Sequence, residues 1–186
     1  MISYICGNMK DRKLTPLQMH RLSPEQYRLR PESGVVIVLD NIRSAYNVGS
    51  AFRSADAFGA DKIYLCGICP APPSAEIHKT ALGAEEAVPW ERCEDTLALS
   101  ERLREEGYTV ISVEQTEHSL KLPAWKPSGT AAKYALIFGN EVEGVQQSVV
   151  DASDFCLEIP QYGTKHSLNV SVSVGIVLFA LTSPAR

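Results

Sequence analysis

The sequence has no apolar run long enough to span a membrane, and its first residues lack the apolar core of a secretory signal peptide. Its five cysteines are odd in number and scattered, which is not the pattern of a disulfide framework. Cys66 and Cys69 form one C-x-x-C pair, but no second Cys or His pair follows at zinc-ligand spacing, and prolines follow where a redox motif opens a helix. These absences predict a reduced, cytoplasmic protein with structural cysteines, no metal site and no membrane contact.

Length and composition are those of one globular domain: 186 residues, 45% of them hydrophobic and 22% charged. The net charge of −4 argues against tight nucleic-acid binding by one chain, because phosphate contacts need Lys and Arg. Residues 1–33 are the exception, with six basic residues against three acidic ones. Such a segment either steers toward phosphate or is a solvated helical surface, and the sequence leaves both open.

Residues 1–33 also carry two helix-start patterns. Thr15-Pro16 and Ser23-Pro24 each place a capping residue before a proline, and Ser23 with Gln26 fits a capping box. We therefore predict a short helical basic arm over residues 1–33, packed on a main domain over residues 34–186.

The main domain alternates β-branched runs with amphipathic ones. Predicted strands lie at Val35–Leu39, Lys62–Cys66, Thr109–Glu114, Tyr134–Phe138 and Phe155–Ile159. One predicted helix begins at Asn47, its expected cap, and three more cover Glu76–Leu82, Thr96–Glu106 and Val145–Ala152. The last predicted helix follows Ser167, its expected cap. Strand–helix–strand spacing predicts an α/β fold with a mostly parallel sheet flanked by helices. The last helix is apolar nearly all round and is expected to be buried.

Polar and glycine-rich segments follow three of these strands. Asn47 and Arg53 follow the first, residues 139–144 the fourth, and Gln161, Ser167 and Asn169 the fifth. In open α/β sheets, ligands bind outside the carboxyl ends of the strands. We therefore expect one composite site built from three loops.

Three stretches carry a family resemblance: NVGSAFRSA at 47–55, IFGNEVEGV at 137–145, and Ile159-Pro160 with SLNVS at 167–171. In this order they resemble the three motifs of the SpoU (TrmH-like) RNA 2′-O-methyltransferases of the SPOUT superfamily, over roughly residues 35–181. The resemblance implies a C-terminal trefoil knot, S-adenosylmethionine bound in the knot loops, and a homodimer with the site near the subunit interface.

It also assigns site residues. The cofactor-binding positions are Phe138, Gly139, Asn140, Glu141, Gly144, Ile159, Pro160, Gln161, Gly163, Ser167, Leu168 and Asn169. The glycines are expected to allow close backbone approach to a bent cofactor. The catalytic positions are Arg53, Asn47, Glu141, Ser167 and Asn169.

Each catalytic assignment has a structural alternative. Arg53 matches the family's catalytic arginine, and a phosphate clamp suits it better than a base because a guanidinium holds its proton too firmly; otherwise it is a surface helix charge. The alternative for Glu141 is that it only organises its loop through backbone N–H groups, and the alternative for Asn169 is that it only starts a helix. The stretch Ala81–Glu85, also similar to family members, is either an RNA-facing lid or simple structure.

The resemblance implies methyl transfer to a ribose 2′-hydroxyl of tRNA or rRNA, with the choice of RNA and nucleotide open. A non-catalytic RNA- or S-adenosylmethionine-binding module that keeps the knotted fold is the competing hypothesis, and the pairing of Arg53 with Asn169 argues against it. A nucleotide-dependent oxidoreductase is disfavoured because G-x-G-x-x-G is missing after the first strand.

Overall fold

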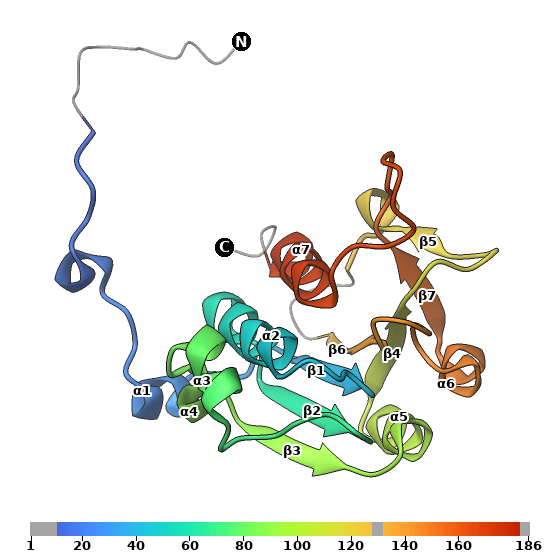
Figure 1. The fold of residues 1–186 in the computed structure, drawn as a ribbon, viewed down its shortest axis with the longest axis horizontal. Helices are drawn as coiled ribbons and strands as arrows, with labels where there is room; N and C mark the ends of the chain where they lie inside the picture. Colours follow the sequence, from blue (N-terminus) through green and yellow to red (C-terminus); the bar gives the residue numbers. More distant parts are fainter. Residues whose placement is uncertain (1–10, 128–131, 183–186) are drawn as a thin grey trace.

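A twisted parallel sheet forms the centre of the molecule, and all its strand pairs are parallel, as predicted (Figure 1). In the described residues its seven strands run in the order β3-β2-β1-β6-β4-β7-β5. They are β1 (Val35–Asp40), β2 (Lys62–Cys66), β3 (Trp90–Cys93), β4 (Tyr108–Val113), β5 (Leu120–Lys121), β6 (Lys133–Phe138) and β7 (Phe155–Glu158). The computed structural model describes residues 11–127 and 132–182. Residues 1–10 of the expected arm, residues 128–131 and the last four residues lie outside that range.

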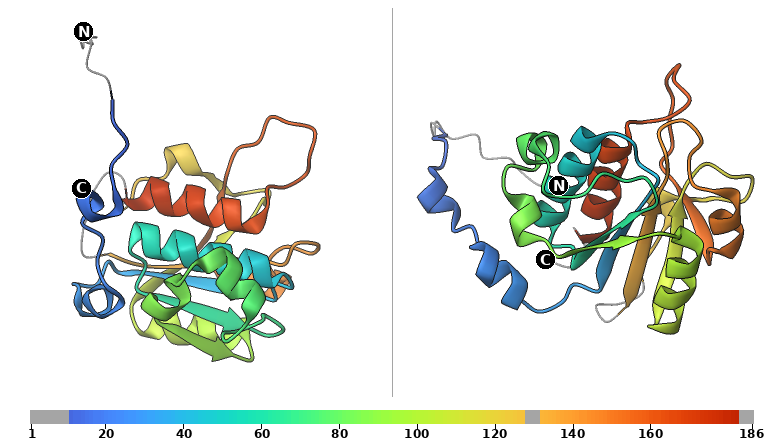
Figure 2. Two further views of the ribbon diagram at one scale, coloured as in Figure 1. Left: turned by 60° about the vertical axis from the view of Figure 1, so that its left-hand side comes forward. Right: turned by 60° about the horizontal axis from the view of Figure 1, so that its bottom comes forward.

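Helices cover both faces of the sheet (Figures 1 and 2). They are α1 (Pro24–Leu29), α2 (Ala45–Phe58), α3 (Ala75–Ala81), α4 (Ala84–Ala87), α5 (Thr96–Glu105), α6 (Gln147–Ala152) and α7 (Val170–Thr182), with short 3₁₀ turns η1 (Pro16–Met19) and η2 (Leu122–Ala124).

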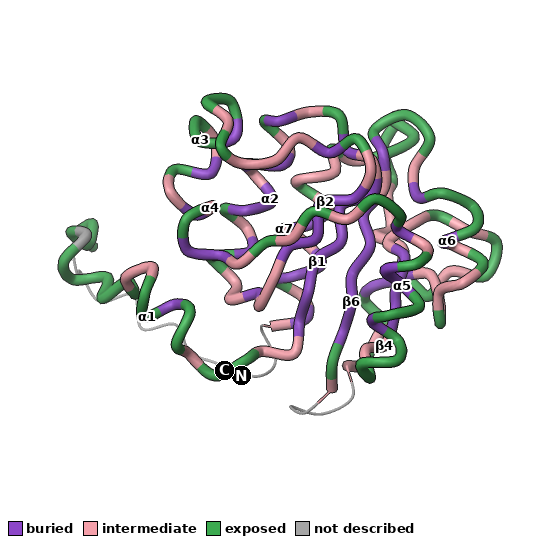
Figure 3. Tube along the Cα trace, turned by 90° about the horizontal axis from the view of Figure 1, so that it is seen from below, coloured by how far each residue is buried: buried purple, intermediate pink, exposed green. Residues whose placement is uncertain are grey.

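Alternation along β1 divides the core in two. Val35, Ile37 and Leu39 face the cluster that contains α2, α3, α4 and α7, whereas Val36 and Val38 face α5 and α6. Successive strand residues point to opposite faces, so a strand covered on both sides is apolar throughout. Accordingly, β1 is buried along its whole length and β6 is buried from its second residue onward (Figure 3).

The edge strands β3 and β5 were not predicted from the sequence. β3 lies at one edge and alternates exposed with half-buried residues, and its Glu91-Arg92 pair interrupts the apolar pattern that identified the others. β5 is only two residues long and exposed at the other edge. Edge strands need little apolar surface, and hydrophobic periodicity is therefore a weak signal for them.

Two predicted helix caps were wrong. The α2 helix begins two residues before Asn47, and Ser44 caps it by accepting a 3.3 Å hydrogen bond from the Asn47 N–H. The α7 helix begins after Asn169, whose side chain accepts a 2.9 Å hydrogen bond from the Ser171 N–H, so Ser167 does not cap it. In both cases several short polar residues near the helix start were suitable as the N-terminal cap, and the sequence alone did not distinguish them.

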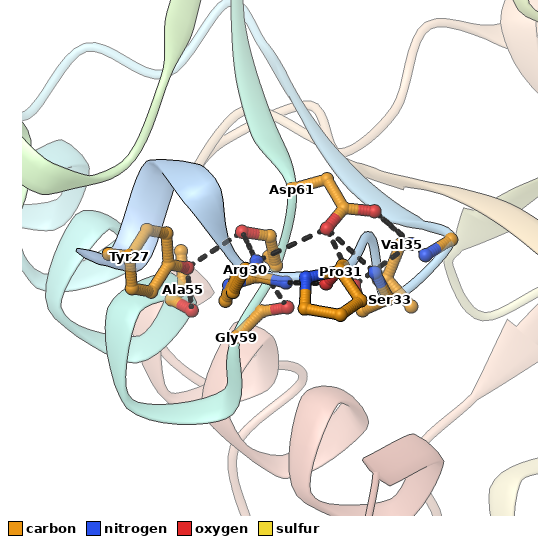
Figure 4. Close-up of polar contacts among 10 residues, drawn as sticks. Tyr27, Arg30, Pro31, Ser33, Val35, Ala55, Gly59 and Asp61 are labelled. Atoms are coloured by element: carbon orange, nitrogen blue, oxygen red, sulfur yellow. Dashed lines mark hydrogen bonds and ion pairs between the residues drawn. The ribbon is translucent and has the colours of Figure 1, made fainter. Parts of the chain in front are cut away.

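The described part of the arm is held at its root (Figure 4). The Tyr27 hydroxyl donates to the Ala60 carbonyl at 2.7 Å, and the Arg30 guanidinium lies 3.1 Å from an Asp61 carboxylate oxygen. Ser23 and Gln26 form the predicted capping box. Residues 17–22, by contrast, are exposed, so the arm packs on the main body only from α1 onward.

The α7 helix is not buried all round, contrary to the prediction. Val174, Val177, Leu178 and Leu181 face the core, whereas Val172 and Phe179 are exposed in the single chain. No helix in the part of the chain that the structure describes is long and apolar enough to cross a membrane.

Candidate functional site

A cavity of about 480 Å³ opens at the carboxyl ends of β4, β6 and β7. Its lining comes from Val113–Gln115 at the end of β4, Phe138–Gly144 at the end of β6, and residues between Leu157 in β7 and Ser173 in α7. Of the predicted cofactor-binding residues, all but Pro160 and Gly163 line it. The structure thus brings the second and third motif loops to one place.

A line of hydrogen bonds joins all three motifs at the edge of this cavity. The Asn169 amide donates to the Asn47 side-chain oxygen at 3.1 Å, and the Asn47 amide donates to Glu141 Oε1 at 2.9 Å. Glu141 also accepts from the backbone N–H groups of Arg43 and Ser44, at 3.2 and 3.3 Å. The start of α7, the first turn of α2 and the β6–α6 loop are therefore held in one arrangement.

These contacts fix the charge of Glu141. Burial by itself raises its pKa, but the hydrogen bonds from Asn47 and from the backbone N–H groups of Glu141, Arg43 and Ser44 outweigh burial and lower the pKa below its ordinary value. At neutral pH the side chain is a carboxylate that only accepts hydrogen bonds. It is suited to organising loops and to facing a positive charge, and unsuited to donating a proton.

The β6–α6 loop is closed by its own backbone. Asn140 exchanges two backbone hydrogen bonds with Gly144, its side-chain oxygen accepts from the Val142 N–H at 2.8 Å, and its amide donates to the Asn41 carbonyl. A Cβ on Gly139 would lie 2.0 Å from the Val145 nitrogen. Gly139 is therefore required for loop closure, whereas Gly163 has no atom within 4 Å of where its Cβ would lie.

Ser167 and Asn169 differ in how firmly they are held. Asn169 is exposed yet bonded on both sides, to Asn47 and to Ser171. Ser167 lines the cavity, is exposed, and forms no side-chain hydrogen bond to another described residue. Its hydroxyl is therefore available to a ligand.

Arg53 lies outside this cavity, in a neighbouring open hollow of about 490 Å³. The hollow is lined by α2, α3 and the first turn of α7, including Lys79, Ser171 and Val172. Arg53 is exposed, and within residues 11–127 and 132–182 it forms no hydrogen bond or ion pair. The start of α7 lines both the cavity and this hollow. The Arg53 guanidinium and Lys79 therefore lie beside the cavity.

Several polar residues at the cavity or behind it were not predicted, among them Glu114, Gln115 and Asp40. Glu114 Oε2 accepts from the Val145 N–H at 3.1 Å, and the Gln115 amide donates to the His166 carbonyl at 2.8 Å; both side chains line the cavity. Asp40 is fully buried behind it, at the end of β1. Each follows or ends a strand, so the rule that located the three loops also applied to them, but no family motif contained them.

The C-x-x-C pair takes no part in the site. Cys66 and Cys69 are buried free thiols, and burial raises the pKa of each to about 12. A protonated, enclosed thiol is a poor nucleophile and a poor metal ligand, as the structural interpretation expected.

Comparison with known proteins identifies the family. The model of the SpoU rRNA Methylase family matches residues 34–179. The chain is 31% identical over 147 residues to the 23S rRNA (guanosine-2′-O-)-methyltransferase RlmB of Neisseria meningitidis, covering 79% of this chain and 57% of that protein. It is 30% identical over 152 residues to the tRNA (guanosine(18)-2′-O)-methyltransferase TARBP1 of Mus musculus, covering 81% of this chain and 9% of that protein.

A solved structure agrees. The AdoMet-bound rRNA methyltransferase from Sinorhizobium meliloti superposes with a TM-score of 0.76 at 28% identity, over 89% of this chain and 62% of that one. The chain thus spans little more than half the length of the RlmB relative and under two thirds of this structural neighbour. With the motifs, the parallel sheet and the family model in agreement, the chain belongs to the SpoU rRNA methylase family of the SPOUT superfamily.

Proposed function

We propose that this protein transfers a methyl group from S-adenosylmethionine to a ribose 2′-hydroxyl of RNA. The observation that carries the proposal is the joining of the three motif loops at one cavity by the Asn169–Asn47–Glu141 hydrogen bonds, with exposed Arg53 next to it. One relative is named for 23S rRNA and another for tRNA. Both names support RNA as the substrate class, and they do not distinguish rRNA from tRNA as the substrate.

The cavity suits the cofactor in size and in charge. A volume of about 480 Å³ lies within the range of small-molecule sites. Glu114, Glu141 and Glu143 line it, and carboxylates favour a ligand that carries a sulfonium and an ammonium group. When bound, S-adenosylmethionine supplies a methyl group already activated on sulfur. The protein therefore has to bind and orient the cofactor and the RNA, and to exclude water from the site.

Arg53 is proposed to hold the RNA in place for transfer. A guanidinium is too weak a base to remove the hydroxyl proton, but it binds phosphate through two parallel hydrogen bonds. From its hollow, Arg53 can bind a phosphate next to the target ribose, and it can stabilise the negative charge that develops on the 2′-oxygen. Lys79, in the same hollow, adds positive charge for the RNA backbone. Ser167 and Asn169 are proposed to face the cofactor.

We propose a homodimer built on α7. Val172 and Phe179 are apolar side chains that are 49% and 60% exposed, and covering the exposed half of such a side chain is favourable by roughly 1 kcal/mol. Two chains also bring two basic arms to one RNA, and two linked contacts bind more tightly than one. We also propose that the α7 segment forms a trefoil knot and that residues 34–186 form the methyltransferase domain. The protein is proposed to act in the cytoplasm.

The proposal is tested by incubating the protein with S-adenosylmethionine and total RNA and analysing the nucleosides by mass spectrometry. A 2′-O-methylated nucleoside should appear, and 2′-O-methylguanosine is the first to seek, because both relatives are named for guanosine. Cofactor binding without any methylated product from either tRNA or rRNA would favour the non-catalytic module instead.

A further inference from the structure

Three potential metal ligands meet at the junction of α3 and α4, away from the cavity. They are His78 near the end of α3 and Glu85 and Glu86 in the first turn of α4, with ligand atoms all within 4.8 Å of one another. The His78 Nδ1 lies 2.5 Å from Glu85 Oε1. Leu82 and Gly83, both with positive φ, reverse the chain and bring the two helices together.

Glu85 gives this group a feature that a surface ion pair lacks. Its side chain is only 8% exposed, and its second oxygen, Oε2, is shielded from solvent and has no hydrogen-bond partner among the described residues. A buried carboxylate oxygen without a partner is unfavourable, and His78 contacts only the other oxygen. The carboxylate is therefore one partner short, and Glu86 offers a further oxygen within 4.8 Å of the His78 and Glu85 ligand atoms.

We propose that His78, Glu85 and Glu86 bind a divalent transition-metal ion of the Zn²⁺ type. One imidazole nitrogen with two carboxylates is a ligand set that Zn²⁺ accepts, with the remaining position open to water. Ligand atoms about 2.0–2.1 Å from a tetrahedral ion lie about 3.3 Å apart, so the His78–Glu85 pair must separate by about 0.8 Å. The His78 side chain is 64% exposed and has room to make that shift.

The ion would clamp α3 to α4 beside the proposed catalytic helix. The Thr80 hydroxyl of α3 donates to the Tyr46 carbonyl of α2 at 3.0 Å, and Lys79 lines the hollow that contains Arg53. Fixing α3 therefore fixes one wall of that hollow. The inference does not depend on methyl transfer, because it concerns binding by residues outside the cavity.

The test is calorimetric titration of EDTA-treated protein with ZnCl₂, with thermal unfolding as a second measurement. We expect one ion per chain with a micromolar Kd, and a melting temperature at least about 3 °C higher at a hundredfold excess over Kd. H78A and E85Q should each weaken binding at least tenfold. H118A, which removes an exposed histidine elsewhere, should bind as the unmodified protein does.

Two results would overturn the proposal: no saturable Zn²⁺ binding, or unchanged affinity in both H78A and E85Q. If E85Q does not fold, H78A decides alone, since His78 is exposed and its loss leaves the core intact. Mg²⁺ prefers an all-oxygen octahedron and should not saturate the site at the same concentration; equal affinity for Mg²⁺ would contradict the proposed ligand set.

Discussion

Asp40 offers a sensitive test of how the site is supported from below. Its Oδ1 accepts from the Thr96 hydroxyl at 2.7 Å, from the Gln146 amide at 2.8 Å and from the Asn41 amide, and its Oδ2 accepts from the Gln146 N–H at 3.1 Å. The side chain is fully buried. Through Gln146 it holds the end of the loop that follows β6.

Asp40→Asn replaces one of the two acceptor oxygens by a donor. The three contacts to Oδ1 survive if the amide oxygen takes that place, and the new NH₂ group then faces the Gln146 N–H. One buried hydrogen bond is lost and a buried donor is left unpaired, which costs about 1–3 kcal/mol. At about 2 kcal/mol, the melting temperature of a domain of this size falls by about 4–8 °C.

The loop that lines the cavity should loosen together with the fold. If about 1.4 kcal/mol of the loss falls on that loop, the Kd for S-adenosylmethionine rises about tenfold. Thermal unfolding and calorimetry measure the two effects. Asp151→Asn is the matched control, since Asp151 is exposed on α6 and its change should stay within about 0.5 kcal/mol. Equal melting temperatures for the two variants would refute the supporting role of Asp40.

Three further predictions concern Glu141, two loop glycines and the buried cysteines. Glu141→Gln should destabilise at pH 7 and match the unmodified protein in acid, because a carboxylate with a lowered pKa stabilises above its unfolded pKa and loses that contribution as pH falls through the folded one; denaturant unfolding from pH 7 to 3 measures this. Gly144→Ala, at φ 73° and with its new Cβ 2.3 Å from Glu114 Oε2, should cost about 1–3 kcal/mol of stability, whereas Gly163→Ala, with no atom within 4 Å of its new Cβ, should leave the melting temperature unchanged. Cys66 and Cys69, with pKa values near 12, should resist a thiol reagent at pH 8 until the protein unfolds; rapid native labelling would disprove this.

The central strands and the place of the site were predictable because both depend on local pattern. Val35–Leu39 is apolar at every position, as a strand covered on both faces must be, and polar loops follow such strands at one edge of a parallel sheet. Edge strands β3 and β5 lacked that pattern.

Partnerships between side chains could not be predicted in the same way. Asn47 was expected to cap a helix, yet it joins Glu141 to Asn169 over separations of 94 and 122 residues. The pairing of His78 with Glu85 depends on a turn through Leu82, a residue that seldom adopts positive φ. Hydrophobic periodicity carries no information on such contacts, because they depend on the fold as a whole.

Arg53 is proposed to act in the transition state of methyl transfer. The direct measurement compares single-turnover methyl transfer to RNA with S-adenosylmethionine affinity, for the unmodified protein and for Arg53→Ala. Loss of one group that stabilises developing charge lowers the rate about a hundredfold or more, while cofactor affinity stays unchanged because Arg53 does not line the cavity. Arg53→Lys should recover only part of the rate, since an ammonium lacks the planar fork. Equal rates for the unmodified protein and Arg53→Ala would contradict the account, as would loss of cofactor binding in the variant.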